Sequence, residues 1–404
     1  MRILYLTQWF EPEPNIIKGL AFVTELQAAG HEVTVVTGLP NYPTGRIYPG
    51  YRLRLIQHEE IDGVRIVRLP LYPSHDSSAV RRSLTFLSFF LSALAYCLFR
   101  AGRYDLAYVY HPPITVGLAA ALAGCVRKLP FVLDVQDLWP DTVATTGLRG
   151  AGMLAGPLGF ACWFVYRRSE LIIAQSSGMC RALVERGVPE RKISTIYNWA
   201  VQEDTRSSLR DANEEGGRFA IVYAGNFGRA QGLATVVAAA ELLSRRRQDI
   251  DIRLIGDGVE AEALRKKVRG ITGISIEPRI SPAELDDVVA GSDALLLHLR
   301  DEPLFRITVP SKTQAYLSYG RPIVAAVGGE AADLLGRSCA AIVVAPDDPV
   351  ALSEAIAEMA DLSLERRESM GAAGRRFYLD NLSFASGMSS TLATVDAAMS
   401  RAVG

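Results

Sequence analysis

Residues 301–322, DEPLFRITVPSKTQAYLSYGRP, combine positive charges, hydroxyl groups and the start of an expected helix. Arg306 and Lys312 supply the cations, and Pro310 fixes the turn before the helix. The first N–H groups of a helix have no partner inside it and lie at the positive end of its dipole, so they bind anions readily. The hydroxyl groups nearby belong to Thr308, Ser311 and Thr313. The segment therefore predicts a pocket for a diphosphate group, and Gln314 is a further polar candidate there.

A glycine-rich turn stands between an expected strand and an expected helix at residues 223–233, YAGNFGRAQGL. Glycine lets the backbone approach a phosphate closely, and Arg229 adds positive charge. A strand-to-helix turn without any ligand has the same pattern, so the turn gains weight only together with residues 301–322. Together with the candidates in residues 301–322, the candidate ligand-binding residues of this half are Gly225, Asn226, Arg229, Gln231, Gly256 and Arg279.

Polar groups also interrupt an apolar run at residues 131–141, FVLDVQDLWPD. Gln136 and Asp137 directly follow an expected strand, and His111 directly follows another. Hydrogen-bond acceptors at strand ends suit a ligand rich in hydroxyl groups. Capping aspartates, a structural tryptophan and a structural histidine would explain the same residues without a ligand. We keep His111, Gln136 and Asp137 as catalytic candidates.

The composition limits the class of protein. The chain has 404 residues, enough for two domains. Its 43 Lys and Arg residues balance 44 Asp and Glu residues, and the net charge of −1 argues against a nucleic-acid partner. The five cysteines are scattered without any C-x-x-C pair, which favours a reducing cytosol and argues against disulfides and zinc. We expect no signal peptide, because residues 2–7 begin like a buried strand.

Residues 84–99, LTFLSFFLSALAYCLF, contain no charged side chain. The segment is short for a membrane span, and its polar residues recur at helical spacing, which leaves a broad apolar face. Those polar residues are Thr85, Ser88, Ser92 and Tyr96. Two interpretations stay open, a crossover helix buried on a sheet and a helix in the membrane interface. The flanking arginines favour the second, because anionic headgroups attract them. They are Arg81, Arg82, Arg100 and Arg103.

Apolar strand-like runs alternate with helical stretches throughout, which predicts an α/β protein with doubly wound parallel sheets. In the first half the expected strands cover residues 3–7, 33–37, 64–69, 106–110, 131–135, 171–174 and 193–197. In the second half they cover residues 221–224, 252–255, 274–277, 294–299, 323–327 and 342–344. The polar stretch 211–217, DANEEGG, indicates a linker. We therefore predict two facing Rossmann-like domains with a ligand cleft at the carboxyl ends of their strands.

Together these motifs resemble those of the retaining GT-B glycosyltransferases of family 4. Within that family the resemblance is to the WbuB/WcaI-like enzymes, which extend polyprenyl-diphosphate-linked sugars. It covers nearly the whole chain and rests on residues 39–52, 71–82, 137–141, 223–233 and 303–316. It implies transfer of a sugar, for example N-acetyl-L-fucosamine, from a UDP-sugar to a polyprenyl-diphosphate-linked sugar in O-antigen, capsule or exopolysaccharide biosynthesis. It also implies that neither a metal nor another cofactor is needed.

The resemblance further implies a role for each part of the chain. Residues 1–200 would bind the acceptor and contain a membrane-associating segment at 81–103. Residues 201–375 would bind the nucleotide sugar, and a helical segment at 376–404 would pack back on the first domain. The implied acceptor-binding residues are Gly19, Asn41, Tyr42, His75, Arg81 and Arg82. The enzyme would lie at the cytoplasmic face of the cell membrane as a peripheral or monotopic protein.

The chain also departs from the family pattern. The Arg and Lys that are typical of the glycine turn are replaced by Asn226 and Gln231, and the His usual before Asp-Leu-Trp-Pro is Gln136. Ile307 and Ala315 stand at the two glutamate positions of the Glu-x7-Glu motif. A diphosphate still needs positive charge nearby. The cations expected to supply it are Arg229, Arg306 and Lys312.

Two other classes of function remain open. A sugar-nucleotide epimerase of the same fold would need acid and base groups such as histidines in its cleft. The small number of histidines, five in the whole chain, and the apolar segment 84–99 argue against it. A non-catalytic, membrane-associated assembly partner would explain the missing family residues. The density of polar motifs at the strand ends argues against that interpretation.

Overall fold

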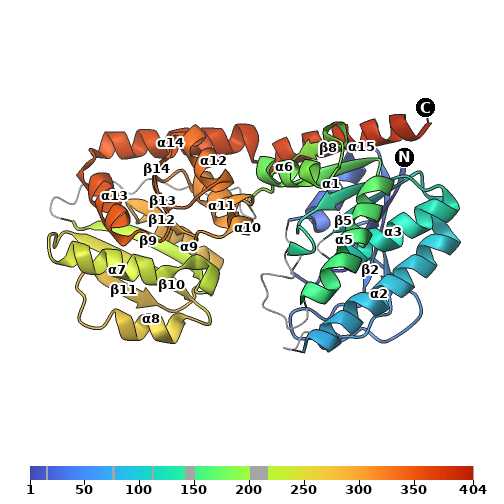
Figure 1. Cartoon of the computed structure of the whole chain (residues 1–404), viewed down its shortest axis with the longest axis horizontal. Coiled ribbons are helices and arrows are strands. Elements are labelled where there is room, and N and C mark those ends of the chain that lie inside the picture. The colour runs from blue at the N-terminus through green and yellow to red at the C-terminus, as the bar shows by residue number, and fades with distance from the viewer. Residues whose placement is uncertain (15–16, 75–77, 112, 142–150, 201–216, 404) are drawn as a thin grey trace. The chain divides into compact units, whose positions relative to one another are not determined.

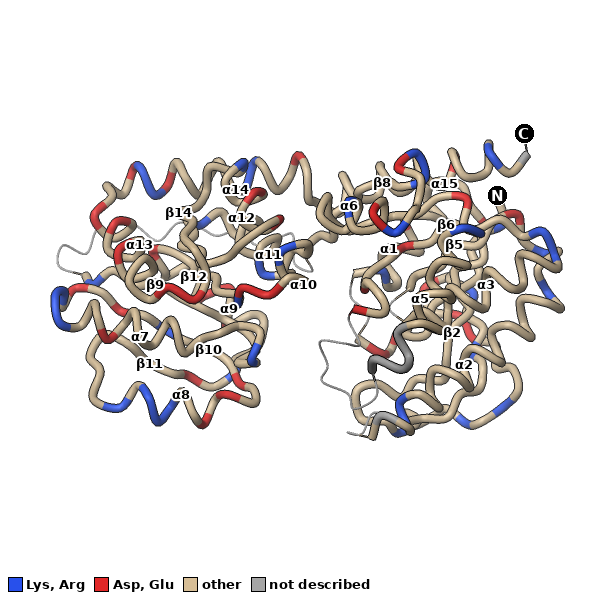
Figure 2. The backbone as a smooth tube through the Cα atoms, in the orientation of Figure 1, with Lys and Arg blue, Asp and Glu red and all other residues tan. Residues whose placement is uncertain are grey.

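The computed structural model describes residues 1–14, 17–74, 78–111, 113–141, 151–200 and 217–403. The chain forms two compact units (Figure 1), of which the first comprises Met1–Tyr197 with Gly387–Gly404 and the second Asn198–Ser386. Basic and acidic residues are interspersed along both units (Figure 2).

The first unit contains an eight-stranded sheet in the order β3-β4-β2-β1-β5-β6-β7-β8. Its strands are β1 (Arg2–Leu6), β2 (Glu32–Gly38), β3 (Gln57–Ile61), β4 (Val64–Leu69), β5 (Leu106–His111), β6 (Phe131–Val135), β7 (Leu171–Ala174) and β8 (Ile193–Thr195). All neighbouring strands are parallel except β3 and β4. Both β5 and β6 are buried at every position, as expected of parallel strands covered on both faces.

The helices of the first unit are α1 (Leu20–Ala28), α2 (Ala79–Arg100), α3 (Ile114–Arg127), α5 (Ala151–Arg168) and α6 (Ser177–Glu185), with short 3-10 turns at Ala101–Arg103 and Glu190–Lys192. Helix α3 packs between α2 and α5, so these three helices form one layer of the unit (Figure 1). The last helix, α15 (Phe384–Val403), belongs to the first unit from Gly387 onward. There the Arg401 guanidinium donates to the Arg191 carbonyl at 3.0 Å.

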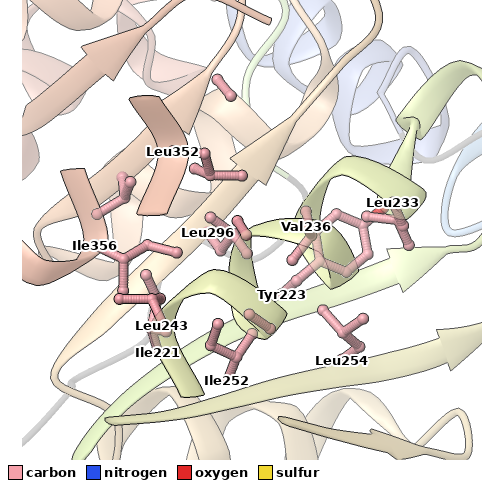
Figure 3. Close-up of a cluster of buried hydrophobic side chains, with 14 of the residues drawn as sticks. Ile221, Tyr223, Leu233, Val236, Leu243, Ile252, Leu254, Leu296, Leu352 and Ile356 are labelled. Carbon is pink, nitrogen blue, oxygen red and sulfur yellow. The ribbon is translucent and has the colours of Figure 1, made fainter. Parts of the chain in front are cut away.

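The second unit contains a six-stranded parallel sheet in the order β11-β10-β9-β12-β13-β14. Its strands are β9 (Phe219–Asn226), β10 (Ile250–Asp257), β11 (Ile274–Glu277), β12 (Ala294–His298), β13 (Ile323–Ala326) and β14 (Ala341–Val344). Its helices are α7 (Leu233–Ser244), α8 (Ala261–Lys267), α9 (Pro282–Ala290), α10 (Pro303–Arg306), α11 (Ser311–Tyr319), α12 (Glu330–Ser338), α13 (Pro349–Asp361) and α14 (Leu364–Asn381), with a 3-10 turn at Arg229–Gln231. Aliphatic side chains of the sheet, α7 and α13 interlock in its core (Figure 3).

This architecture confirms the predicted pair of Rossmann-like α/β domains. Every predicted strand overlaps an observed strand. The sequence did not reveal β3, an antiparallel edge strand with the polar sequence QHEEI. Charged residues keep such an edge from pairing with other chains, and they also remove the apolar signal of a strand. The linker predicted at residues 211–217 lies, apart from Gly217, outside the described residues.

Candidate functional site

In the second unit, two glycines hold the ends of β9 and β10 in very close approach. Gly225 and Gly256 are paired in the register of the two strands, and both have a positive φ, +141° and +155°. A Cβ atom on Gly256 would lie 1.8 Å from the Gly225 carbonyl oxygen, so no side chain fits there. Because Gly225 and Asn226 are exposed, the carboxyl edge of the sheet presents bare backbone at this point.

The ammonium group of Lys312 lies directly against this glycine turn. A Cβ atom on Gly225 would meet the Lys312 Nζ atom at 2.7 Å. The ammonium donates to the Tyr223 hydroxyl at 2.5 Å and sits 4.1 Å from the centre of the Tyr223 ring. Burial lowers the pKa of Lys312 to about 8. Among the described residues no carboxylate forms a salt bridge with Lys312, which is the arrangement expected where an anion completes the site.

Lys312 stands in the first turn of α11, whose other polar residues have separate tasks. Ser311 is exposed at the start of the helix. Thr313 is fully buried, and its hydroxyl has no hydrogen-bond partner among the described residues. The buried Gln314 amide donates to the carbonyls of Pro310 and Ser311, at 2.7 and 3.2 Å. Gln314 therefore stabilises its own turn, and its predicted ligand-binding role stays a prediction.

The predicted arginines are placed less favourably than Lys312. Arg306 forms a bidentate ion pair with Asp301, with distances of 2.5 and 2.6 Å, so it already has a carboxylate partner within the chain. Arg229 lies in the 3-10 turn after β9, Arg279 follows β11, and both are exposed. Of the cations expected to replace the missing family charges, only Lys312 is both half-buried and in contact with the glycine turn.

A histidine that the sequence analysis missed holds the glycine turn to the sheet. His298 ends β12 and is almost fully buried, and its Nδ1 atom lies 2.8 Å from the Gln231 carbonyl oxygen. The Gln231 side chain in turn accepts a hydrogen bond from the Gly228 N–H at 3.1 Å. Gln231 therefore stabilises the glycine turn through its own side chain and carbonyl group. The only available signal for His298 was a single polar residue in the apolar run ALLLHL.

In the first unit, a buried ion pair stands beside the predicted catalytic residues. The Lys18 ammonium lies 3.2 Å from Asp134, and both side chains are almost completely buried. Asp134 also accepts hydrogen bonds from the Tyr108 hydroxyl and the Gln136 amide, each at 2.5 Å. Burial lowers the pKa of Lys18, and the charge of Asp134 opposes that shift. The network fixes the orientation of the Gln136 side chain at the carboxyl end of β6.

The other two catalytic candidates of this unit lie at neighbouring strand ends. Burial lowers the pKa of His111 to about 3, so its imidazole is neutral. Its ring carbon Cδ2 lies 2.9 Å from the position that a Cβ atom on Gly117 would take. Neither ring nitrogen has a hydrogen-bond partner among the described residues. Burial raises the pKa of Asp137.

The loop that carries Asn41 and Tyr42 is held by a carboxylate that the sequence analysis missed. Glu13 is buried and accepts hydrogen bonds from the backbone N–H groups of Asn41 and Tyr42, at 2.7 and 2.8 Å. Burial raises the pKa of Glu13 to about 7. The Tyr42 ring lies 6.0 Å from that of Trp9, which lies 6.3 Å from Phe86 of α2. The loop is thus connected to α2 through aromatic contacts.

Three of the remaining acceptor candidates, Gly19, Arg81 and Arg82, lie at the starts of α1 and α2. Gly19 is the buried N-cap residue of α1. The Arg81 N–H donates to the capping Ser78 hydroxyl at 3.4 Å, while the Arg81 side chain is exposed and that of Arg82 half-buried. His75 lies outside the described residues.

Helix α2 has an unusual distribution of polar and apolar residues. Its polar side chains face the protein: Ser92 donates to the Pro70 carbonyl at 2.7 Å, and Ser88 accepts from the Tyr72 N–H at 2.8 Å. Several of its large apolar side chains face outward: Leu87, Leu91 and Phe99 are all at least half exposed, whereas Phe89 is buried. By length and composition, Val80–Arg103 could cross a membrane, and little of it is buried.

No group of three or more His, Cys, Asp or Glu side chains within the described ranges is placed to hold a metal ion.

Two family matches account for most of the chain. Residues 20–199 match the glycosyl transferase 4-like domain, and residues 218–361 match the glycosyl transferases group 1 domain. The division between the matches agrees with the two Rossmann-like units. The chain is therefore a glycosyltransferase of the GT-B fold, an enzyme that transfers sugars.

Two bacterial relatives cover most of the chain. The chain is 26% identical to the putative colanic acid biosynthesis glycosyl transferase WcaI of Escherichia coli over 81% of this chain and 84% of the relative. It is 24% identical to the probable glycosyltransferase WbjE of Pseudomonas aeruginosa over 70% and 72%.

Solved structures share the fold. Anabaena Alr3699/HepE in complex with UDP and glucose has a TM-score of 0.65 at 16% identity, covering 98% of this chain and 99% of that protein. The sucrose-phosphate synthase of Thermosynechococcus elongatus has a TM-score of 0.69 at 16% identity, covering 99% of each chain.

Proposed function

We propose that the chain is a retaining, WbuB/WcaI-like glycosyltransferase that moves a sugar from a UDP-sugar to a polyprenyl-diphosphate-linked sugar. The product would serve O-antigen, capsule or exopolysaccharide assembly. The observation that carries this proposal is the half-buried Lys312 ammonium, which lies against the Gly225 turn without a carboxylate partner among the described residues. An N-acetylated amino sugar such as N-acetyl-L-fucosamine is one donor sugar to test.

The donor diphosphate would lie between the glycine turn and the start of α11. Exposed backbone at Gly225, which buried Gly256 lets lie close to β10, allows close approach. Lys312 supplies charge, and the first N–H groups of α11 supply donors. The buried Thr313 hydroxyl is a further group that a ligand or water could satisfy. The complex of the structurally similar HepE with UDP and glucose supports a uridine nucleotide as the donor.

In the proposed reaction the bond between the anomeric carbon and the diphosphate oxygen breaks, and a bond to the acceptor hydroxyl forms on the same face of the sugar. The departing diphosphate takes the acceptor proton, so no separate enzyme base is required, and direct transfer on one face requires no enzyme nucleophile. Lys312 would stabilise the negative charge that grows on the leaving group. Neutral His111 and the oriented Gln136 would contact the sugar or the acceptor hydroxyl, and Asp137 would accept a hydrogen bond from it.

The acceptor would bind to the first unit, at the loop of Asn41 and Tyr42 and the starts of α1 and α2. The relative WcaI, named for colanic acid biosynthesis, supports a substrate of polysaccharide assembly. The outward apolar face of α2 supports a lipid-linked acceptor, because it would hold the enzyme at the cytoplasmic face of the membrane.

Replacing Lys312 by Met tests the donor site. A charge-assisted contact to a phosphate contributes about 1.5–3 kcal/mol, so Lys312→Met should weaken UDP-sugar binding by about tenfold to a hundredfold in calorimetry. In the unaltered protein, binding should also weaken as the pH rises through about 8, where Lys312 loses its proton. Lys312→Arg, which keeps its charge, should remove that pH dependence.

The matched control is Lys266→Met, because Lys266 is exposed and paired with Glu262 in the same unit. It should leave donor binding unchanged. Unaltered UDP-sugar affinity in Lys312→Met would refute the proposed donor site.

A further inference from the structure

Exposed aromatic residues on α5 form a second apolar surface in the helix layer of the first unit. Phe160 and Trp163 are 67% and 48% exposed, and their rings are stacked with centres 5.5 Å apart. The Arg167 guanidinium lies 5.6 Å from the Trp163 ring. A tryptophan and a phenylalanine are large apolar groups to leave in water, and an arginine beside them is a cation at the same surface.

This surface lies in the same layer as the apolar face of α2. Helix α3 packs between α2 and α5 (Figure 1), and it is mostly buried. Along α2, apolar side chains recur with helical spacing and stay exposed: Leu84 44%, Leu87 50%, Leu91 56% and Phe99 82%. Since one helical residue rises by about 1.5 Å, this face extends over roughly 22 Å.

All three helices of the layer end with basic residues. The cations at or directly after their last turns are Arg100, Arg103, Arg127, Lys128, Arg167 and Arg168. A cation at the carboxyl end of a helix also complements the helix dipole. That effect accounts for one cation at each end, but it gives no reason for the apolar side chains Phe99, Val126 and Trp163 to be exposed beside them.

We propose that α5 is a second membrane anchor, so that the enzyme docks on an anionic lipid surface through α2 and α5 together. Aromatic side chains favour the level of the lipid headgroups, and basic residues beside them attract anionic headgroups. Two helices that each expose an apolar face and end in cations match such a surface. The polar contacts of α2 point into the protein, which leaves its outer face apolar. This inference rests on the proposed function only in that the acceptor is a membrane lipid.

Binding of the full chain to vesicles tests the proposal. Sedimentation with vesicles of equimolar phosphatidylcholine and phosphatidylglycerol should recover the unaltered protein, and phosphatidylcholine alone should recover less. The double variant Phe160→Ser with Trp163→Ser should bind the mixed vesicles about tenfold more weakly, because two apolar groups no longer enter the interface. Brominated lipids should quench the tryptophan fluorescence of the unaltered protein. They should quench the fluorescence of the Trp163→Phe variant less, because that variant lacks the tryptophan expected to enter the interface.

The matched control is Val259→Ser, which removes an exposed apolar side chain of the second unit and should bind vesicles like the unaltered protein. Transfer to a short-chain, water-soluble acceptor should be the same in the α5 double variant and in the unaltered enzyme. Vesicle binding without any transfer would defeat the proposed function but support the anchor. Unchanged vesicle binding in the double variant would overturn the proposed anchor. A dimer of the unaltered protein in solution that the double variant dissociates would also overturn it, because the aromatic residues would then form a contact between two copies of the chain.

Discussion

At the scale of single residues, the chain places charged groups inside the first unit that composition and spacing do not reveal. Lys18 and Asp134 form a buried ion pair, and Glu13 is a buried carboxyl group that binds two backbone N–H groups. Buried charged groups occur in proteins only where partners compensate them. Their burial depends on the fold, so the sequence identified Asp134 only as one polar residue of the segment 131–141 and did not identify Lys18 or Glu13.

Glu13 makes a testable contribution to the pH dependence of stability. Its pKa is raised to about 7 in the folded protein from an ordinary value of 4.5, so the folded state binds more protons than the unfolded state between these values. Stability should therefore fall as the pH rises from 4.5 through 7. Glu13→Gln keeps an oxygen for the Asn41 and Tyr42 N–H groups and carries no charge. It should raise the free energy of unfolding at pH 8 by an amount of the order of 1–3 kcal/mol.

Urea unfolding at pH 4.5 and pH 8 measures this effect. The variant and the unaltered protein should differ little at the lower pH. Glu25→Gln is the control, because Glu25 is exposed on α1, and it should change neither curve. An equal difference between Glu13→Gln and the unaltered protein at both pH values would contradict a raised pKa.

At the scale of elements, most of the fold could be predicted and part of the site could not. Apolar runs of Val, Ile and Leu identified the buried parallel strands, since burial on both faces leaves a continuous signal. The same reasoning missed β3, whose polar residues suit an exposed edge. The glycine turn and the start of α11 were predicted to share a diphosphate pocket, and the structure brings Lys312 against Gly225. The ion pair between Arg306 and Asp301 was not predicted, because charged residues five positions apart need a particular turn to meet.

The close approach of β9 and β10 gives an element-scale prediction. Gly256→Ala would place a Cβ atom 1.8 Å from the Gly225 carbonyl oxygen, so the two strand ends must separate. This should destabilise the second unit by about 1–3 kcal/mol and abolish detectable UDP-sugar binding.

Thermal unfolding and calorimetric titration measure the two effects. The control is Gly336→Ala in α12, where a Cβ atom would meet nothing within 4 Å. It should keep full binding and be neutral or slightly stabilising, since alanine is the better helix former. Normal UDP-sugar affinity in Gly256→Ala would show that the glycine pair does not shape the donor site.

At the scale of the whole molecule, the sequence predicted two Rossmann-like domains, and the family matches assign a glycosyltransferase domain to each half of the chain. The role of each unit was implied by resemblance and remains a proposal. The first unit offers a polar strand end at Gln136 and, on α2, an outward apolar face. The second offers a cation at a bare backbone turn. These surfaces suit a lipid-linked sugar and a nucleotide diphosphate respectively, which is the combination that a lipid-directed sugar transferase requires.

The most direct test of the central claim is the mass of the lipid product. The purified enzyme would be incubated with polyprenyl-diphosphate-GlcNAc and a panel of UDP- and GDP-sugars. We expect a UDP-sugar to increase the mass of the lipid by one sugar residue, with release of UDP only when the acceptor is present. An unchanged lipid mass with every donor, or conversion of the donor sugar without any acceptor, would contradict this expectation.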